Sequence, residues 1–301
     1  MKISRCLSIL SCAVIVTLYG ASPALAGPLL GPDLSSFTVL GSSTVTNTGT
    51  STISGNVGVS PGTSITGFPP GVVTGGTVQA HTASAIAAQS QLTTAITGLG
   101  SLGPGTALGA NLAGLTLTPG VYTVAAGTTN LSGTLTLNGQ GNANAAWVFQ
   151  MPSTLITSSN SVVNVINTGS GAGVYWNVGS SATIAVNTTF IGNILALASI
   201  TMNTSATDLC GRALASTAAV TLDTNNLSGT CTGQLAGSNG LSGGLSVSGT
   251  TVSFLPYAPV NVPEPSTLPL LGLGFVGLGL FGLRRTVETN GLQRIAMIVS
   301  A

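Results

Sequence analysis

ATIAVNT at residues 182–188 is followed by ASITMNT at 198–204 and AAVTLDT at 218–224, three copies of one threonine-containing pattern. Repetition of this kind is typical of stacked structural units in which each copy forms one layer. Apolar and small polar residues alternate within every copy, and successive side chains of a β-strand point to opposite faces. The pattern therefore predicts stacked strands with a buried apolar row and an outer row of small polar residues.

The alternation assigns the residues of the copies to these two rows. The expected core row is Ile184, Val186, Ile200, Met202, Val220 and Leu222. The expected outer row is Thr183, Ala185, Asn187, Ser199, Thr201, Asn203, Ala219, Thr221 and Asp223, extended by Thr44, Thr46 and Thr48 of an earlier segment. A competing outer face would contain Thr116, Thr118, Thr134, Thr136 and Asn138.

Strand-like segments broken by Gly and Pro continue on both sides of the copies, at residues 44–71, 112–124 and 132–151. Residues 78–99 differ, because apolar residues recur there at spacings of three and four, as on one face of a helix. These apolar residues are Ala85, Ala88, Leu92, Ala95, Ile96 and Leu99. The sequence thus predicts a mostly β fold, an irregular β-solenoid of triangular or flattened section, with one long helix packed alongside.

The solenoid domain is expected to span residues 34–227, with residues 228–261 as a cap or linker rich in Gly and Ser. Charged residues make up only 4% of the 301 residues, against about 25% in an ordinary globular protein. No patch of Lys and Arg is available to contact phosphates, which excludes nucleic-acid binding. The hydrophobic content of 44%, arranged in alternating runs, favours a packed core over disorder.

Residues 1–26 have the features of a secretory signal, because Lys2 and Arg5 precede an apolar stretch that ends in small residues at Ala26. Export leaves Cys210 and Cys231 in an oxidising compartment, where we expect them to form a disulfide. The loop of about 20 residues would contribute roughly 3 kcal/mol in the chain-entropy model. Two thiols without a histidine cluster do not make a metal site, and none is expected.

Near the C-terminus, Val262-Pro263-Glu264-Pro265 precedes an apolar stretch at 268–283 and the pair Arg284-Arg285. These residues, 262–285, resemble a PEP-CTERM sorting signal. The resemblance implies a secreted or cell-surface protein of a Gram-negative bacterium, recognised near Pro-Glu-Pro by an exosortase-type membrane enzyme. It also implies membrane contact only through this segment. A plain membrane anchor is the alternative, and the tail at 286–301 is longer than such signals normally carry.

Catalytic residues are not expected, because the combinations that catalysis needs are missing. His81 has no neighbouring carboxylate or nucleophile motif. Asp208, Arg212 and Asp223 are expected to form a surface salt bridge at a strand corner, rather than the paired carboxylates of a glycosidase. Glycine-rich stretches such as 139–141 lack the lysine or helix of a phosphate site.

A flat, uncharged array of small side chains can instead order water. Residues two apart on a strand are separated by about 6.6 Å and neighbouring strands by about 4.8 Å, of the same order as the repeat distances of ice. A threonine methyl can hold water in a cage while its hydroxyl anchors it. Each exchange of a hydroxyl for water contributes at most about 1 kcal/mol, so many groups must act together on a rigid surface.

Blocks of residues 34–226 resemble, in order, the microbial ice-binding protein family. The resemblance implies a discontinuous β-solenoid with a long helix, adsorption to ice, inhibition of ice growth and recrystallisation, and neither catalysis nor a cofactor. A cell-surface adhesin or exopolysaccharide-associated structural protein is the alternative, and it should expose aromatic or carboxylate groups. The blocks are residues 44–71, the helix, GLTLTPGVYTV, GTLTLNGQGNANAAWVFQM, YWNVGSSATI, FIGNILALASITMNTSAT and GRALASTAAVTLDTN.

Overall fold

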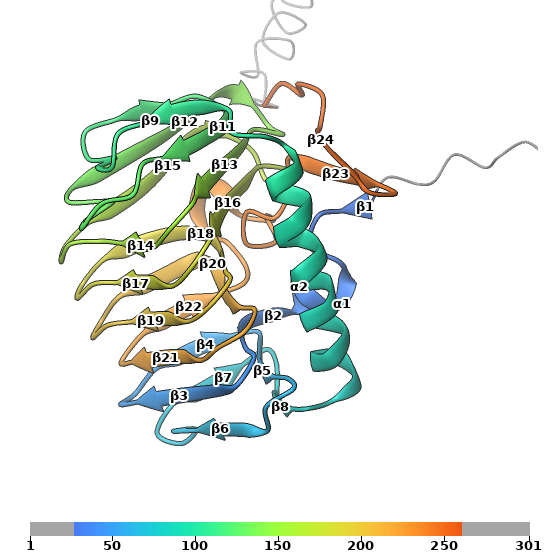
Figure 1. Ribbon diagram of the computed structural model, residues 1–301, viewed down its shortest axis with the longest axis vertical. Helices are drawn as coiled ribbons and strands as arrows, with labels where there is room; N and C mark the ends of the chain where they lie inside the picture. The colour runs from blue at the N-terminus through green and yellow to red at the C-terminus, as the bar shows by residue number, and fades with distance from the viewer. Residues whose placement is uncertain (1–26, 261–301) are drawn as a thin grey trace, which may run out of the picture. The chain divides into compact units, whose positions relative to one another are not determined.

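The computed structural model describes residues 27–260, so the predicted secretory signal and sorting segment lie outside the described part. The described residues are mostly β, as the sequence predicted. Short parallel strands stack on one another along the molecule, and one long helix runs beside the stack (Figure 1). Among the helices of this range, none combines the length and apolar character needed to cross a membrane.

One sheet contains all three repeated copies and is named here the threonine sheet. Its six strands are parallel and follow the order β14-β17-β19-β21-β3-β6. The bounds are β14 Leu155–Ile156, β17 Ala182–Ile184, β19 Ile200–Met202, β21 Val220–Asp223, β3 Thr44–Thr48 and β6 Ser64–Thr66. The chain thus returns to this sheet once per turn, and two N-terminal strands complete it below the last copy.

The remaining parallel strands form a 15-stranded sheet that two long strands, β18 Thr189–Ala196 and β20 Thr207–Ala215, divide into two faces. The register between them shifts at Phe190 and Gly192, where each strand passes from one face to the other. The second face adds β10 Thr116–Leu117, β12 Thr134–Asn142, β15 Val162–Thr168, β22 Asn226–Ser228, β4 Thr52–Ser54 and β7 Val72–Thr74. The helix face adds β9 Thr106–Leu108, β11 Gly120–Val124, β13 Ala146–Met151, β16 Gly173–Val178, β2 Phe37–Gly41, β5 Asn56–Val59 and β8 Val78–Ala80.

The space enclosed by the three faces is filled by side chains that stack from turn to turn. Phe149 and Trp176, paired directly across β13 and β16, lie with ring centroids 4.1 Å apart and 11° between their planes. Tyr122 and Phe190 continue this stack at 5.9 and 5.0 Å. Because identical positions meet in parallel register, one aromatic ladder and the aliphatic rows beside it form a continuous core.

Helix α2, Ala83–Ser101, connects one end of the stack to the other. Its 19 residues extend about 28 Å at 1.5 Å per residue, close to the height of six stacked strands. Thr82 caps it, its hydroxyl accepting a hydrogen bond from the amide of Ala85 at 3.2 Å. The apolar stripe packs on outward-pointing residues of the helix face, among them Val148, Tyr175 and Leu214, which are buried in the same cluster.

The C-terminal residues fold back over the stack. After the 3₁₀ turn η1, Gly233–Leu235, strands β23 Leu245–Ser248 and β24 Thr251–Phe254 join β1 Gly27–Pro28 in a small antiparallel sheet beside α2. The short helix α1, Pro32–Ser36, lies between β1 and β2. Arg212 links these parts, because its guanidinium donates to carbonyls of Ser35, Gly229 and Asn239.

Two expectations about individual residues are wrong. Val186 is 38% exposed rather than core, because Ala182 and Ile184 pair with Ile200 and Met202. Aligning the copies on their first alanines places Ala182 opposite Ala198, but in the structure Ala182 pairs with Ile200, two residues further along. Since side chains alternate with period two, a shift of two residues leaves the outer row on the same face.

The Asp208 and Arg212 side chains are buried, and they do not form the predicted surface salt bridge with Asp223. Burial raises the pKa of Asp208 well above its ordinary value, although the amides of Cys210 and Gly192 and the charge of Arg212 oppose this. One carboxylate oxygen, Oδ2, has no hydrogen-bond partner among the described residues. Burial also lowers the pKa of Arg212 to about 10. The partners of Arg212, at Ser35 and Asn239, are far away in sequence.

The predicted disulfide is confirmed. Cys210 of β20 and Cys231 are bonded across a separation of 21 residues, with their Cα atoms 4.6 Å apart. Thiol titration of the unreduced, denatured protein beginning at Gly27 should find no free thiol. The double change Cys210→Ser and Cys231→Ser should lower the free energy of unfolding by about 3 kcal/mol, since it releases a loop in the unfolded chain. Two titratable thiols in the unreduced protein would contradict the bond.

Asp208 should make stability depend on pH. The folded protein holds its proton more tightly than the unfolded chain, so this contribution is complete below the unfolded pKa of about 4 and is lost as pH rises towards the raised folded value. The stability of Asp208→Asn relative to the natural protein should therefore increase as the pH rises from about 4. Urea unfolding midpoints measure this difference, in which the other titrating groups cancel. An unchanged difference would mean that Asp208 is ionised in the folded protein.

Candidate functional site

The central feature of the threonine sheet is a column of threonines that occupy one outward position on neighbouring strands. Thr183 pairs with Thr201, Thr201 with Thr221, Thr221 with Thr46, and Thr46 with Thr66. Parallel strands in such register place equivalent side chains about 4.8 Å apart. Ile156 takes the same position on β14 and ends the column.

Flanking positions of the same sheet carry small polar or apolar side chains. On one side Thr44 pairs with Ser64, while the Ser199 hydroxyl donates to the Ser181 hydroxyl at 3.0 Å. On the other side Asp223 pairs with Thr48. Of the predicted outer row, Thr44, Asp223 and Thr48 lie on strands of the sheet. The residues immediately before or after a strand are Ser199, Ala219, Ala185 and Asn203.

Left-handed corners follow the strands of this sheet and maintain a regular turn. Asn187, Ser205 and Thr224 have φ of 56°, 60° and 54°, and Gly49 and Gly67 both have φ of 82°. Asn187 therefore lies at the corner rather than in a strand, where its amide donates to the Thr204 carbonyl at 3.1 Å. Successive turns leave the sheet in the same way, so the sheet can keep one register over its whole height.

Asp223 is the one charged residue of the predicted outer row, and its carboxylate is occupied locally. It accepts hydrogen bonds from the hydroxyls of Thr204 and Thr224, both at the corner. The backbone amide of Asp223 donates to the Asn225 side chain at 2.6 Å. The charge is thus held at the rim of the sheet, beside the threonine column.

The competing face is less regular. Thr116, Thr136 and Asn164 share one outward position of the second face, but Thr134 pairs with Val162, and further along Leu209 and Val72 are 44% and 53% exposed. The Asn138 side-chain oxygen already accepts bonds from Gln140 and Asn167. The Thr118 carbonyl accepts a bond from the Tyr122 hydroxyl. Branched apolar side chains therefore interrupt this face at several heights.

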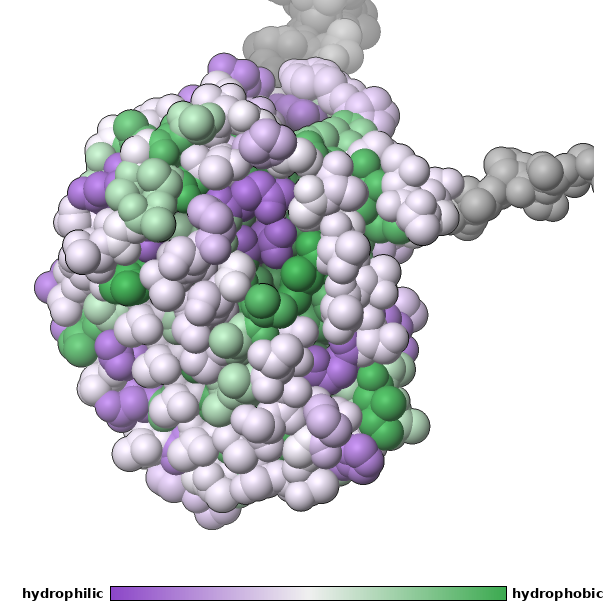
Figure 2. All heavy atoms as spheres, in the orientation of Figure 1, coloured by the Kyte–Doolittle hydropathy of each residue, from purple (hydrophilic) through white to green (hydrophobic). Residues whose placement is uncertain are grey.

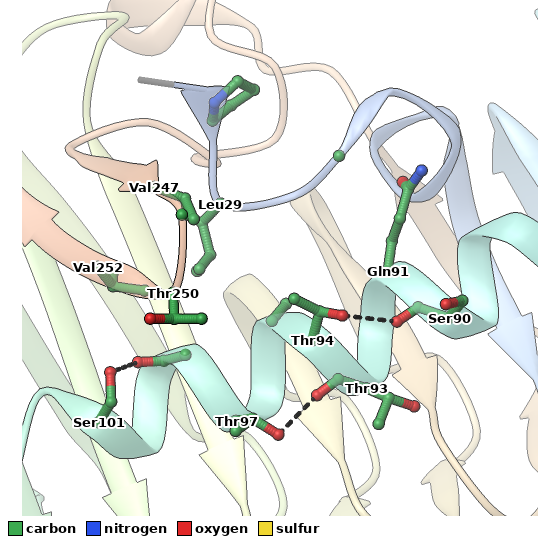
Figure 3. Close-up of a pocket in the computed structure, with 15 residues that line it drawn as sticks. Leu29, Ser90, Gln91, Thr93, Thr94, Thr97, Ser101, Val247, Thr250 and Val252 are labelled. Carbon is green, nitrogen blue, oxygen red and sulfur yellow. Dashed lines mark hydrogen bonds between the residues drawn. The ribbon is translucent and has the colours of Figure 1, made fainter. Parts of the chain in front are cut away.

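A groove between α2 and the small antiparallel sheet is a further candidate (Figure 3). The hydroxyls of Thr94, Thr97 and Ser101 along it bond back to carbonyls of their own helix, at 3.1, 3.0 and 2.7 Å. Their polar groups are thus occupied, and Leu29, Val247 and Val252 supply an apolar wall (Figure 3). The groove presents no converging polar groups for a ligand or for a reaction.

Charge and metal ligands are sparse over the described part of the chain. Within residues 27–260, no group of three His, Cys, Asp or Glu side chains is close enough to hold a metal ion. Figure 2 shows a mostly pale surface of intermediate hydropathy on the face in view, with small separate polar and apolar areas. Of the three faces, the helix face is covered and the second face is uneven, which leaves the threonine sheet as the regular open array.

Ser64, Thr66 and Ser181 are additional members of the outer row that the sequence patterns did not identify. Thr66 belongs to the segment at 44–71, which alternates in the same way, so its strand was recognisable. Its position beside Thr46 was not, because β6 is short and lies between residues with turn propensity. The pairing in the structure extends the column by one full strand.

Comparison with known proteins gives two family matches and several relatives. Residues 39–228 match the family described as ice-binding-like, and residues 261–285 match the PEP-CTERM protein-sorting motif. An ice-binding protein of Nostoc sp. (strain HG1) is 42% identical, with 95% of this chain and 97% of that protein covered.

Solved structures show the same fold. An ice-binding protein from an Antarctic biological consortium superposes with a TM-score of 0.61 at 38% identity, covering 67% of this chain and 91% of that one. A second, from the Antarctic ascomycete Antarctomyces psychrotrophicus, superposes with a TM-score of 0.60 at 37% identity, covering 65% and 95%. The family match at residues 39–228 contains all six strands of the threonine sheet.

Proposed function

Because the chain belongs to the ice-binding-like family, we propose that it adsorbs to ice through the threonine sheet and thereby inhibits ice growth and recrystallisation. The observation that carries this proposal is the column Thr183, Thr201, Thr221, Thr46 and Thr66, held in register on an open face. The named relatives from Nostoc and from Antarctic sources support ice as the ligand. The proposed contact surface is this column with its flanking residues.

The mechanism follows from rigidity and from the absence of strong hydration. Threonine methyls on a flat sheet let water form cages over them, while the hydroxyls hydrogen-bond that layer at fixed points about 4.8 Å apart. Each group contributes little, about 1 kcal/mol or less, because it exchanges one partner for water or ice. Five equivalent positions on one backbone lattice add these contributions without an ordering cost on binding. No catalytic step is involved, and a non-enzymatic role is what the family implies.

We infer that the parallel coil is an irregular β-solenoid whose domain spans residues 34–227, with residues 228–261 as its cap. Turns that return to the same three faces support this, as does the helix along one face. The chain carries a PEP-CTERM motif, which indicates an extracellular or cell-surface protein. Removal of residues 1–26 on export, sorting by an exosortase-type enzyme and a Gram-negative host complete the proposal.

Replacing Thr201 by Tyr should abolish most recrystallisation inhibition. The ring would stand in the middle of the column and separate its neighbours from an ordered water layer, while the buried row is unchanged. Its matched control is Thr136→Tyr, which places the same ring on the second face. The assay is inhibition of ice recrystallisation at equal protein concentration, with melting temperatures compared. Full activity in Thr201→Tyr and loss in Thr136→Tyr at equal stability would move the site to the second face.

Thr46→Tyr tests whether the N-terminal strands belong to the same surface. Thr46 lies directly between Thr221 and Thr66, so its replacement should reduce activity about as strongly as that of Thr201. Thr52→Tyr is the control, because Thr52 is exposed on β4 of the second face in the same N-terminal segment. Recrystallisation inhibition and thermal unfolding of both variants are measured. If Thr46→Tyr retains activity, the contact surface comprises the three repeated copies alone.

A further inference from the structure

Residues 255–258 of the main body are named here the C-terminal strap, and they are hydrogen-bonded to residues 139–144. This second segment is the irregular end of β12 with the turn that follows it, and it is called here the turn at 139–144. The Ala143 amide donates to the Ala258 carbonyl at 2.6 Å, and the Ala258 amide donates to the Asn142 side chain at 3.0 Å. The Asn144 side chain donates to the Pro256 carbonyl at 3.1 Å. The strap is therefore a fixed part of the coil, and not a loose connection.

Two aromatic side chains at this place remain outside the core. Tyr257 is 65% exposed, the highest value among the large hydrophobic side chains of the described residues, and Phe254 is 40% exposed. The Tyr257 hydroxyl donates to the Gly141 carbonyl at 3.2 Å, which holds the exposed ring in place on the turn. The exposed ring is therefore available to an external partner.

The next residues of the chain indicate the partner. The PEP-CTERM match at residues 261–285 begins three residues after the strap, and it contains the apolar stretch 268–283. Ten residues from Ala258 to Leu268 span at most about 36 Å, so a membrane that takes up the apolar stretch keeps the strap within that distance of its surface. Tyrosine and other aromatic residues favour the headgroup level, where an apolar ring and a polar tip are both accommodated.

Charge supports the same partner class. Residues 139–144 and the strap contain no charged side chain; the charged residues of the range 27–260 are Asp33, Asp208, Arg212 and Asp223. Of these, Asp208 and Arg212 are buried, and Asp223 lies on the threonine sheet. A neutral surface of Gly, Asn, Gln and Tyr neither requires an acidic lipid nor repels one, and its amide groups can hydrogen-bond to lipid headgroups and interfacial water. The strap and the turn are therefore suited to a lipid surface whatever the charge of its headgroups.

We propose that, while the C-terminal segment holds the chain in a membrane, the strap and the turn at 139–144 lie against the lipid headgroups, with Tyr257 and Phe254 as interfacial anchors. This surface belongs to the end of the coil that carries β12, whereas the threonine sheet runs from β14 to β6 along its length (Figure 1). The threonine sheet therefore remains open to the medium. The inference rests on the sorting role of the C-terminal segment and is independent of ice binding.

The test uses the chain from Gly27 to Ala301 in phosphatidylcholine vesicles, with bromine atoms near the headgroup end of the acyl chains as fluorescence quenchers. Trp147 and Trp176 are fully buried, so the natural protein supplies a constant background. The emission that Tyr257→Trp adds above this background should fall roughly twofold in brominated vesicles relative to unbrominated ones. The control is Val72→Trp, on an exposed edge strand at the other end of the coil, which should show no loss.

Phe254→Trp is a second reporter, in case the change at Tyr257 detaches the strap from the turn. Equal quenching at residues 72 and 257, or no quenching at 254 and 257 in a chain that floats with the vesicles, overturns the inference alone. A chain that does not float with the vesicles overturns the membrane attachment, and the inference with it. Recrystallisation assays on the same proteins report the ice-binding role separately, so each failure can be distinguished from the others.

Discussion

The register of parallel backbone pairing is the constraint on which the rest of this structure depends. Hydrogen bonds between neighbouring strands hold Thr183, Thr201, Thr221, Thr46 and Thr66 at one repeat distance, whatever their separation in sequence. A single side chain could not order water to a useful extent, because its free energy of interaction is comparable to thermal energy. The regular backbone spacing places many weak, equivalent contacts at one repeat distance, so that they act together on an ordered water layer.

The interior and the helix maintain that lattice. The aromatic stack of Tyr122, Phe149, Trp176 and Phe190 supports successive turns from inside, so the sheet has little freedom to twist or slip. Helix α2 covers the one face whose outward residues are large and apolar, and it thereby leaves the face with small residues uncovered. The position of the open face therefore depends on which apolar residues the helix covers, as well as on the threonines.

The local parts of this architecture were predictable from sequence, and the non-local parts were not. Alternation identified the outward Thr residues, and spacing of three and four identified the helix, because both patterns lie within a single element. Val186 was misassigned because the sequence aligns the first copy with the second in two registers, two residues apart. In the structure Ile184, and not Val186, pairs with Met202, which in turn pairs with Leu222. The buried Arg212 was also missed, since its partners at Ser35 and Asn239 come from opposite ends of the domain.

The position of β3 beside β21 has a consequence for the order of events during synthesis. Thr46 is made about 175 residues before its partner Thr221, whereas β6, on the other edge of β3, follows soon after it. One edge of β3 must therefore remain unpaired until almost the whole domain has been made, which suits export of an unfolded chain. Folding then ends in a long-range closure, the slowest kind of contact to form. A nascent chain carries two incomplete lattices, and they become one continuous surface only in that final step.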